Sequence, residues 1–247
     1  MMVSRSSTKR SSKRYLITLA KIFCVTYGCG FEDSNLLDPI ALGDEHLKKE
    51  QFRHAIGAYR LALHKDSLDF VVWGRLAKAY SAQGNKNAAD LYLKKSTSGF
   101  LRAGQDAMDS GSDSLALIHY SNLLDIDPFN SMAYVFSGDI YHRSGNLSKA
   151  LNSYLAAIKI DSVNHNSWFR LGEVHRKSQN NILAVNAYKK AIKININSFR
   201  SYMALGSIYL ASQKLVLAEN SYQKALLIKP NLISARSALE YINDQMK

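Results

Sequence analysis

The residue types best suited to chemistry are few and scattered along this chain of 247 residues. The chain holds two cysteines, Cys24 and Cys29, and seven histidines, and none of them is set at the spacing of a metal-binding motif. The sequence contains no Gly-rich phosphate loop, no serine elbow and no nucleophile beside a base. We therefore predict no catalytic residue, no cofactor-binding residue, no metal ligand and no enzymatic activity.

Cys29 is the one residue whose surroundings indicate a reaction. Residues 1–14 are basic and rich in serine, residues 15–27 are largely apolar, and Gly28 directly precedes the cysteine. This layout over residues 1–28 is typical of a secretory signal peptide, and a small residue before cysteine resembles the lipobox of bacterial lipoproteins. The resemblance implies lipidation of Cys29, a linker over 29–35 and a lipid anchor on the periplasmic face of a bacterial membrane, expected to be the outer membrane.

Two residues depart from that pattern, because Lys21 interrupts the apolar run and Thr26 stands where the lipobox usually has leucine. A lysine in so short a run opposes membrane insertion, and a segment without acidic residues is also typical of mitochondrial transit peptides. An ordinary or uncleaved signal, a transit peptide and a plain tail on a cytoplasmic protein therefore stay open as alternatives. A transmembrane helix is not expected, since the run has thirteen residues where about 20 are needed.

The rest of the chain repeats with a period of 34 residues. Six positions of one unit return in the next, with Trp168, Leu171, Gly172, Ala184, Tyr188 and Ala191 followed by Tyr202, Leu205, Gly206, Ala218, Tyr222 and Ala225. A period of this length indicates units that stack into an array. The order aromatic, Leu-Gly, Ala, Tyr, Ala resembles the tetratricopeptide repeat, which implies an all-α, right-handed superhelical solenoid of helix-turn-helix units over about residues 36–247.

The register predicts about six units and a capping helix, divided into an N-terminal part at 36–96 and a C-terminal part at 97–247. It fails once, because Phe100 follows Trp73 by 27 residues instead of 34. The deficit of seven is close to two helical turns, so we expect a long or kinked helix from about Lys86 to join the two parts. The last helix has no partner, as expected of a cap.

A glycine recurs in one slot of the register, at Gly43, Gly104, Gly138, Gly172 and Gly206. Small residues recurring in one slot indicate that the two helices of a unit approach each other closely there. A large side chain in this slot should force the helices apart.

In the tetratricopeptide family a partner lies against the inner face of the first helices of the units. The slots that match this face hold a mixed basic and apolar set, which we predict to be the partner-binding groove: Asp139, His142, Arg143, Phe169, Glu173, Arg176, Lys177, Arg200 and Met203. We expect Arg143, Arg176 and Arg200 to be exposed and to attract an acidic residue of a protein partner. The alternative is a charged helix face that contacts only solvent and binds no partner, which would have the same composition.

The chain carries a net charge of +12, and six basic residues without an acidic one lie in residues 1–28. No arginine-rich stripe or aromatic stacking motif accompanies this charge, so we predict no nucleic-acid partner. The size, the lipobox-like start and the number of units resemble pilotin-type lipoproteins of bacterial pilus machines, in particular those of tight-adherence pili. The resemblance implies a secretin or another pilus-assembly protein as partner and a role in pilus assembly or secretion. The competing hypothesis is a soluble or organelle-targeted adaptor that binds a peptide or helix of a partner complex.

Overall fold

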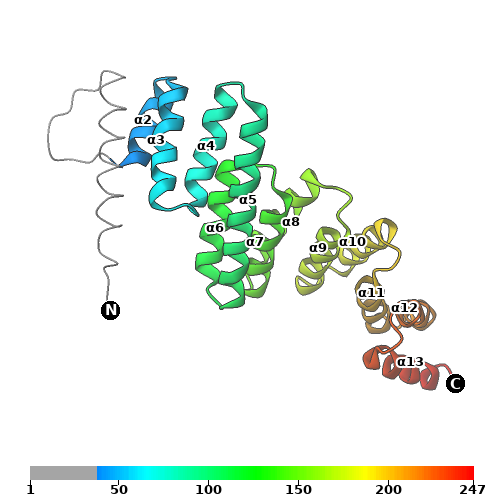
Figure 1. Ribbon diagram of the computed structural model, residues 1–247. Coiled ribbons are helices and arrows are strands. Elements are labelled where there is room, and N and C mark those ends of the chain that lie inside the picture. Colours follow the sequence, from blue (N-terminus) through cyan, green and yellow to red (C-terminus); the bar gives the residue numbers. More distant parts are fainter. Residues whose placement is uncertain (1–37) are drawn as a thin grey trace, which may run out of the picture.

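The computed structural model describes residues 38–247, and within them it contains twelve α-helices and no strand. They are α2 (Pro39–Lys48), α3 (Phe52–Lys65), α4 (Phe70–Ala82), α5 (Lys86–Asp109), α6 (Asp113–Ile126), α7 (Ser131–Arg143), α8 (Leu147–Ile160), α9 (His165–Lys177), α10 (Asn181–Ile194), α11 (Phe199–Ala211), α12 (Leu215–Ile228) and α13 (Ile233–Gln245). Each helix packs against its neighbours in the chain, so the helices form one continuous superhelical stack from α2 to α13 (Figure 1). The predicted all-α solenoid is confirmed.

The two helices of a unit are held together where a tyrosine of the second helix crosses a glycine of the first. A Cβ atom added to Gly172 would lie 2.5 Å from Cε1 of Tyr188, and one added to Gly43 would lie 2.3 Å from Cε1 of Tyr59. Both tyrosines are fully buried. Only glycine allows this approach, which confirms the expected role of the recurring small residue.

The turn inside each unit has the same backbone shape in all six units. The second residue after each first helix has a positive φ, and in three units that residue is glycine, with φ of 85° at Gly84 and 79° at Gly145. The other three units place Glu50, Gln179 and Gln213 in this left-handed conformation, at φ of 58°, 61° and 57°. Residues that carry a Cβ atom are strained in this conformation, so these three units keep the turn at an energetic cost.

The irregular spacing in the register produces the long helix α5, which runs unbroken over 24 residues. It packs against α4, where Gly99 faces Phe70, and against α6, where Gly104 faces Tyr120, so one helix serves two units as expected. The boundary proposed at residues 96 and 97 falls inside this continuous helix. Ser96 is fully buried at that point, and its Oγ donates a hydrogen bond to the carbonyl of Phe70 at 2.7 Å.

The last helix, α13, packs against α12 and completes the stack. Ala235 and Ile242 are fully buried in a cluster with Ala218 and Tyr222 of α12, while Tyr241 on another face of α13 is exposed. One apolar stripe therefore covers the final unit, as predicted for a cap.

The signal peptide predicted at 1–28, the linker at 29–35 and the lipidation site Cys29 lie outside the described residues. Among residues 38–247, no helix combines the length and the hydropathy that a bilayer crossing requires.

Candidate protein-binding face

The residues predicted to line a groove lie on α7, α9 and α11, the first helices of three consecutive units; we call them the first-helix face. The buried tyrosine of each second helix ends on this face. Tyr154 donates a hydrogen bond through its hydroxyl to Oδ1 of Asp139 at 2.5 Å, and the Tyr188 hydroxyl donates to Oε1 of Glu173. Burial raises the pKa of both phenols, and the neighbouring carboxylates raise it further, so both tyrosines stay protonated donors at neutral pH.

An arginine of the following unit completes the arrangement around Asp139. Arg170 of α9 places Nη2 3.1 Å from Oδ2 of Asp139, so this carboxylate meets both Tyr154 and Arg170. Only 17% of the Asp139 side chain is exposed. This acid of the first-helix face is therefore occupied by contacts within the chain.

The same arrangement recurs in the first two units. The Tyr59 hydroxyl donates to Oδ1 of Asp44 at 2.7 Å, and Nη1 of Arg75 lies 2.5 Å from Oδ2 of the same residue. In both cases the arginine follows the aspartate by 31 residues. The repeat thus places an acid and a base of consecutive units at one recurring contact.

Glu173 is paired within its own helix. Its carboxylate accepts a hydrogen bond from Nη2 of Arg176 at 2.9 Å and another from Tyr188. Burial by itself raises the pKa of Glu173, but the hydrogen bonds from Arg176 and Tyr188 outweigh it, so the pKa lies below its usual value. The carboxylate is charged at neutral pH and holds the guanidinium of Arg176 beside it.

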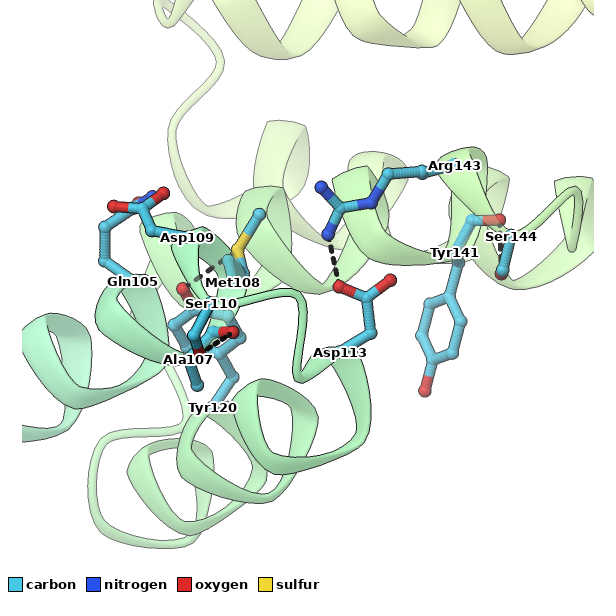
Figure 2. Close-up of polar contacts among 10 residues, drawn as sticks. All are labelled: Gln105, Ala107, Met108, Asp109, Ser110, Asp113, Tyr120, Tyr141, Arg143 and Ser144. Atoms are coloured by element: carbon cyan, nitrogen blue, oxygen red, sulfur yellow. Dashed lines mark hydrogen bonds and ion pairs between the residues drawn. The ribbon is translucent and has the colours of Figure 1, made fainter.

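Arg143 reaches back to the preceding unit. Figure 2 shows its guanidinium directed at Asp113, the first residue of α6, with which it forms an ion pair. The side chain of Arg143 is 53% exposed and that of Arg176 is 47% exposed, and Arg200 is also exposed. The predicted exposure of the three arginines is confirmed.

The third unit departs from the tyrosine–acid pattern. Gln105 stands in the slot that holds Asp44, Asp139 and Glu173 in three other units, and its Nε2 donates to Oδ1 of Asp109 at 3.0 Å. The Tyr120 hydroxyl donates instead to the sulfur of Met108 at 3.3 Å (Figure 2). Burial, together with Asp109 and Asp139, raises the pKa of Tyr120 to about 12.

His142 and Lys177 link α7 to α9. The Lys177 ammonium donates to the backbone carbonyl of His142 at 3.2 Å. Nε2 of His142 is buried and has no hydrogen-bond partner among the described residues. Burial, followed by the charge of Lys177, lowers the pKa of His142, so its ring is neutral at neutral pH.

The remaining predicted residues lie on the same helices but differ in exposure. Phe169 is partly buried, with its ring centroid 5.8 Å from that of Tyr188. Met203 packs against the cluster formed by α12 and α13. The guanidinium of Arg200 lies 6.0 Å from the ring centroid of Phe199. Met203 and Phe169 therefore contribute to packing as well as to the surface.

Sequence reasoning missed the partners that hold these side chains, namely Arg170, Tyr154, Tyr188 and Asp113. A signal for one contact was present, because Asp44 and Arg75 have the same spacing as Asp139 and Arg170. Among residues 38–247, no three histidine, cysteine or acidic side chains gather as metal ligands would. The first-helix face offers ion pairs and hydrogen bonds, which suit recognition.

Comparison with protein families identifies the repeats. A model described as TPR repeat matches residues 138–179, and a model described as Tetratricopeptide repeat matches residues 71–98, 165–195 and 199–232. No curated protein compared with the sequence matches it. The matched stretches contain all of α8, α9, α10, α11 and α12 and nearly all of α4, so the family models and the structure define the same units.

The fold has a counterpart among solved structures. A chain in the crystal structure of the APC/C hetero-tetramer Cut9–Hcn1 matches with a TM-score of 0.54 and 18% identity, over 83% of this chain and 42% of that one. The crystal structure of MamA matches with a TM-score of 0.49 and 21% identity, over 81% of this chain and 97% of that one. The present chain thus spans less than half of the Cut9–Hcn1 chain that it matches. The part of the chain described by the structure is an all-α tetratricopeptide-repeat superhelix.

Proposed function

We propose that this chain is a non-catalytic scaffold whose first-helix face binds an acidic segment of a protein partner. Tetratricopeptide repeats indicate a protein–protein interaction scaffold, and the fold is typically non-catalytic.

The observation that carries the proposal is the unequal exposure of opposite charges on this face. The acids Asp139 and Glu173 are 17% and 21% exposed, and each accepts a hydrogen bond from a buried tyrosine. The side chains of Arg143 and Arg176 are about half exposed. Ion pairs between exposed groups contribute roughly 0 to 1 kcal/mol, so an incoming carboxylate can replace Asp113 beside Arg143 at little cost. Beside Arg176 it can join Glu173 without displacing it, because half of the arginine side chain is open to solvent.

The test is charge reversal of the three exposed arginines in the full-length chain, as Arg143→Glu, Arg176→Glu and Arg200→Glu together. Co-purification from the native cell followed by quantitative mass spectrometry would compare the variant with the wild type. The partner should be depleted, and its affinity should fall by about 1 to 3 kcal/mol in total.

The matched control reverses three exposed lysines that lie at the starts or ends of second helices, as Lys86→Glu, Lys159→Glu and Lys214→Glu. This variant changes the net charge by the same amount and should retain the partner. Equal recovery of the partner with the arginine variant and the wild type would refute binding at the first-helix face.

We further propose that a lipid on Cys29 tethers the scaffold to the periplasmic face of a bacterial outer membrane, where it helps to assemble a pilus or secretion machine by binding its secretin. The lipobox-like sequence before Cys29 supports this placement. Intact mass of membrane-extracted protein tests it, since the mature chain should begin at Cys29 with added acyl mass. A soluble species that retains Met1 or is cut elsewhere would favour the alternative, a soluble or organelle-targeted adaptor.

A further inference from the structure

A concave site lies between α9 and α10, and it shares no residue with the first-helix face. It encloses about 490 Å³. Nine residues line it, namely Trp168, Leu171, His175, Leu183, Asn186, Ala187, Lys189, Lys190 and Lys193. The proposed function uses none of these side chains.

The rim of this site is strongly cationic. Lys189, Lys190 and Lys193 are all exposed, and α10 contains no acidic residue between Asn181 and Ile194. Within residues 38–247, none of the three ammonium groups forms an ion pair or a hydrogen bond. Three like charges within five residues of one helix repel each other, so an anion bound there would relieve the repulsion.

The floor of the site is apolar. Leu171 and Ala187 are nearly fully buried, and Trp168 of α9 is partly exposed beside them. The indole Nε1 donates to the carbonyl of Ser162 at 3.0 Å, which satisfies its one donor. The ring therefore offers an apolar surface with no unsatisfied polar group.

We propose that this site, which we call the lysine pocket, is a second docking site that takes an acidic peptide segment of a protein partner. One large apolar side chain of the segment rests against Trp168, and flanking carboxylates meet Lys189, Lys190 and Lys193. The pairing of an apolar floor with an unneutralised cationic rim matches a segment that carries both features. A hollow accepts a single side chain, whereas a bilayer surface would contact only the rim, so the shape favours a peptide.

The probe is a random-peptide library displayed on phage, selected on the full-length chain and depleted on a variant with Lys189→Glu, Lys190→Glu and Lys193→Glu. We expect enriched peptides in which an aromatic or large aliphatic residue is flanked by acidic residues. A synthetic peptide of the enriched sequence should bind the lysine variant at least about tenfold more weakly than the wild type, as measured by fluorescence anisotropy. Its affinity should also fall for Leu183→Asp, since Leu183 is 44% exposed and lines the pocket.

Trp168 provides a readout that is specific to the site. The chain has two tryptophans, so Trp73→Phe leaves Trp168 as the only source of tryptophan fluorescence, which is excited selectively over tyrosine. Binding at the lysine pocket should shift its emission, and binding at the first-helix face should not. The peptide should bind the three-arginine variant and the Lys86, Lys159 and Lys214 control within about twofold of the wild type.

Three results would overturn the proposal. The first is a selection that yields no acidic peptides with an apolar residue. The second is an equal loss of affinity in the control variant, which would show attraction by net charge alone. The third is a Trp168 shift produced by vesicles of phosphatidylcholine and phosphatidylglycerol but not by the peptides, which would assign the surface to membranes. If the three-arginine variant retained its partner, the first-helix proposal would fail. The peptide selection, the peptide affinities and the Trp168 emission shift expected for the lysine pocket would stay the same.

Discussion

Arg170 of α9 lies 3.1 Å from Asp139 of α7, and the ion pair between them repeats the contact that joins Arg75 of α4 to Asp44 of α2. Each arginine belongs to the unit that follows the unit of its aspartate. Because the tyrosine of the aspartate's own unit donates to the same carboxylate, the contact couples packing inside a unit to stacking between units. The paired acids of the first-helix face therefore serve structure, while its arginines remain exposed.

We expect the Asp139–Arg170 pair to stabilise the stack. Asp139→Asn removes the charge beside Arg170, whose Nε is buried without a partner among residues 38–247, and should lower the free energy of unfolding by about 1 to 3 kcal/mol. Urea denaturation of Asp139→Asn, Arg170→Met and the double variant measures the coupling. The exposed pair Arg102–Asp106, at 3.9 Å, is the control and should show none. Additive effects at Asp139 and Arg170 would contradict the prediction.

Gly172→Ala should destabilise the chain although alanine favours helices more than glycine does. The new Cβ would lie 2.5 Å from Cε1 of Tyr188, which is fully buried and whose hydroxyl is held by its hydrogen bond to Glu173. We expect a loss of about 1 to 3 kcal/mol from overpacking, measured by urea denaturation. In the background of Tyr188→Leu the same change should cost less, because the clashing ring is absent. A neutral or stabilising Gly172→Ala in the wild-type background would show that the helices can separate freely.

Gln179→Gly should stabilise the chain. Gln179 has φ of 61°, where equivalent positions in other units hold glycine. Relief of the left-handed strain, about 1 to 2 kcal/mol, exceeds the entropy that glycine adds to the unfolded chain, about 0.5 to 1 kcal/mol. Thermal and urea unfolding should show a net gain of about 0.5 to 1 kcal/mol. Gln83→Gly is the matched control, since Gln83 has φ of −73° and should lose stability on the same change.

Alkaline pH should unfold the chain through its buried tyrosines. Burial raises the pKa of Tyr120 from the ordinary tyrosine value of 10.0 to about 12. The folded state keeps the phenol proton that the unfolded state loses, so this contribution to stability is complete below about pH 10 and is lost as pH rises toward about 12. Urea midpoints measured across this range should fall less steeply for Tyr120→Phe than for the wild type. Parallel pH profiles would show that the Tyr120 hydroxyl is solvated in the folded state.

The sequence by itself determined the helical units, and the reason is that burial is periodic. Residues separated by one 34-residue period meet the same environment, so glycine and tyrosine recur at Gly172 and Tyr188 as they do at Gly206 and Tyr222. The shortened spacing between Trp73 and Phe100 likewise required helix α5 to serve two units. The missing residues amount to two helical turns, so the apolar residues before and after the deletion stay on the same side of the helix.

The tertiary structure alone decided which polar side chains meet. Arg143 and Asp113 are 30 residues apart and lie on helices of different units, so their contact depends on how those helices stack and on the side-chain rotamers. The same holds for the lysine pocket, whose floor comes from both α9 and α10 and whose cationic rim comes from α10. A periodic pattern reports which face of a helix is buried, but the partner of an exposed charge is set by the angle and distance between packed helices, which no single helix encodes.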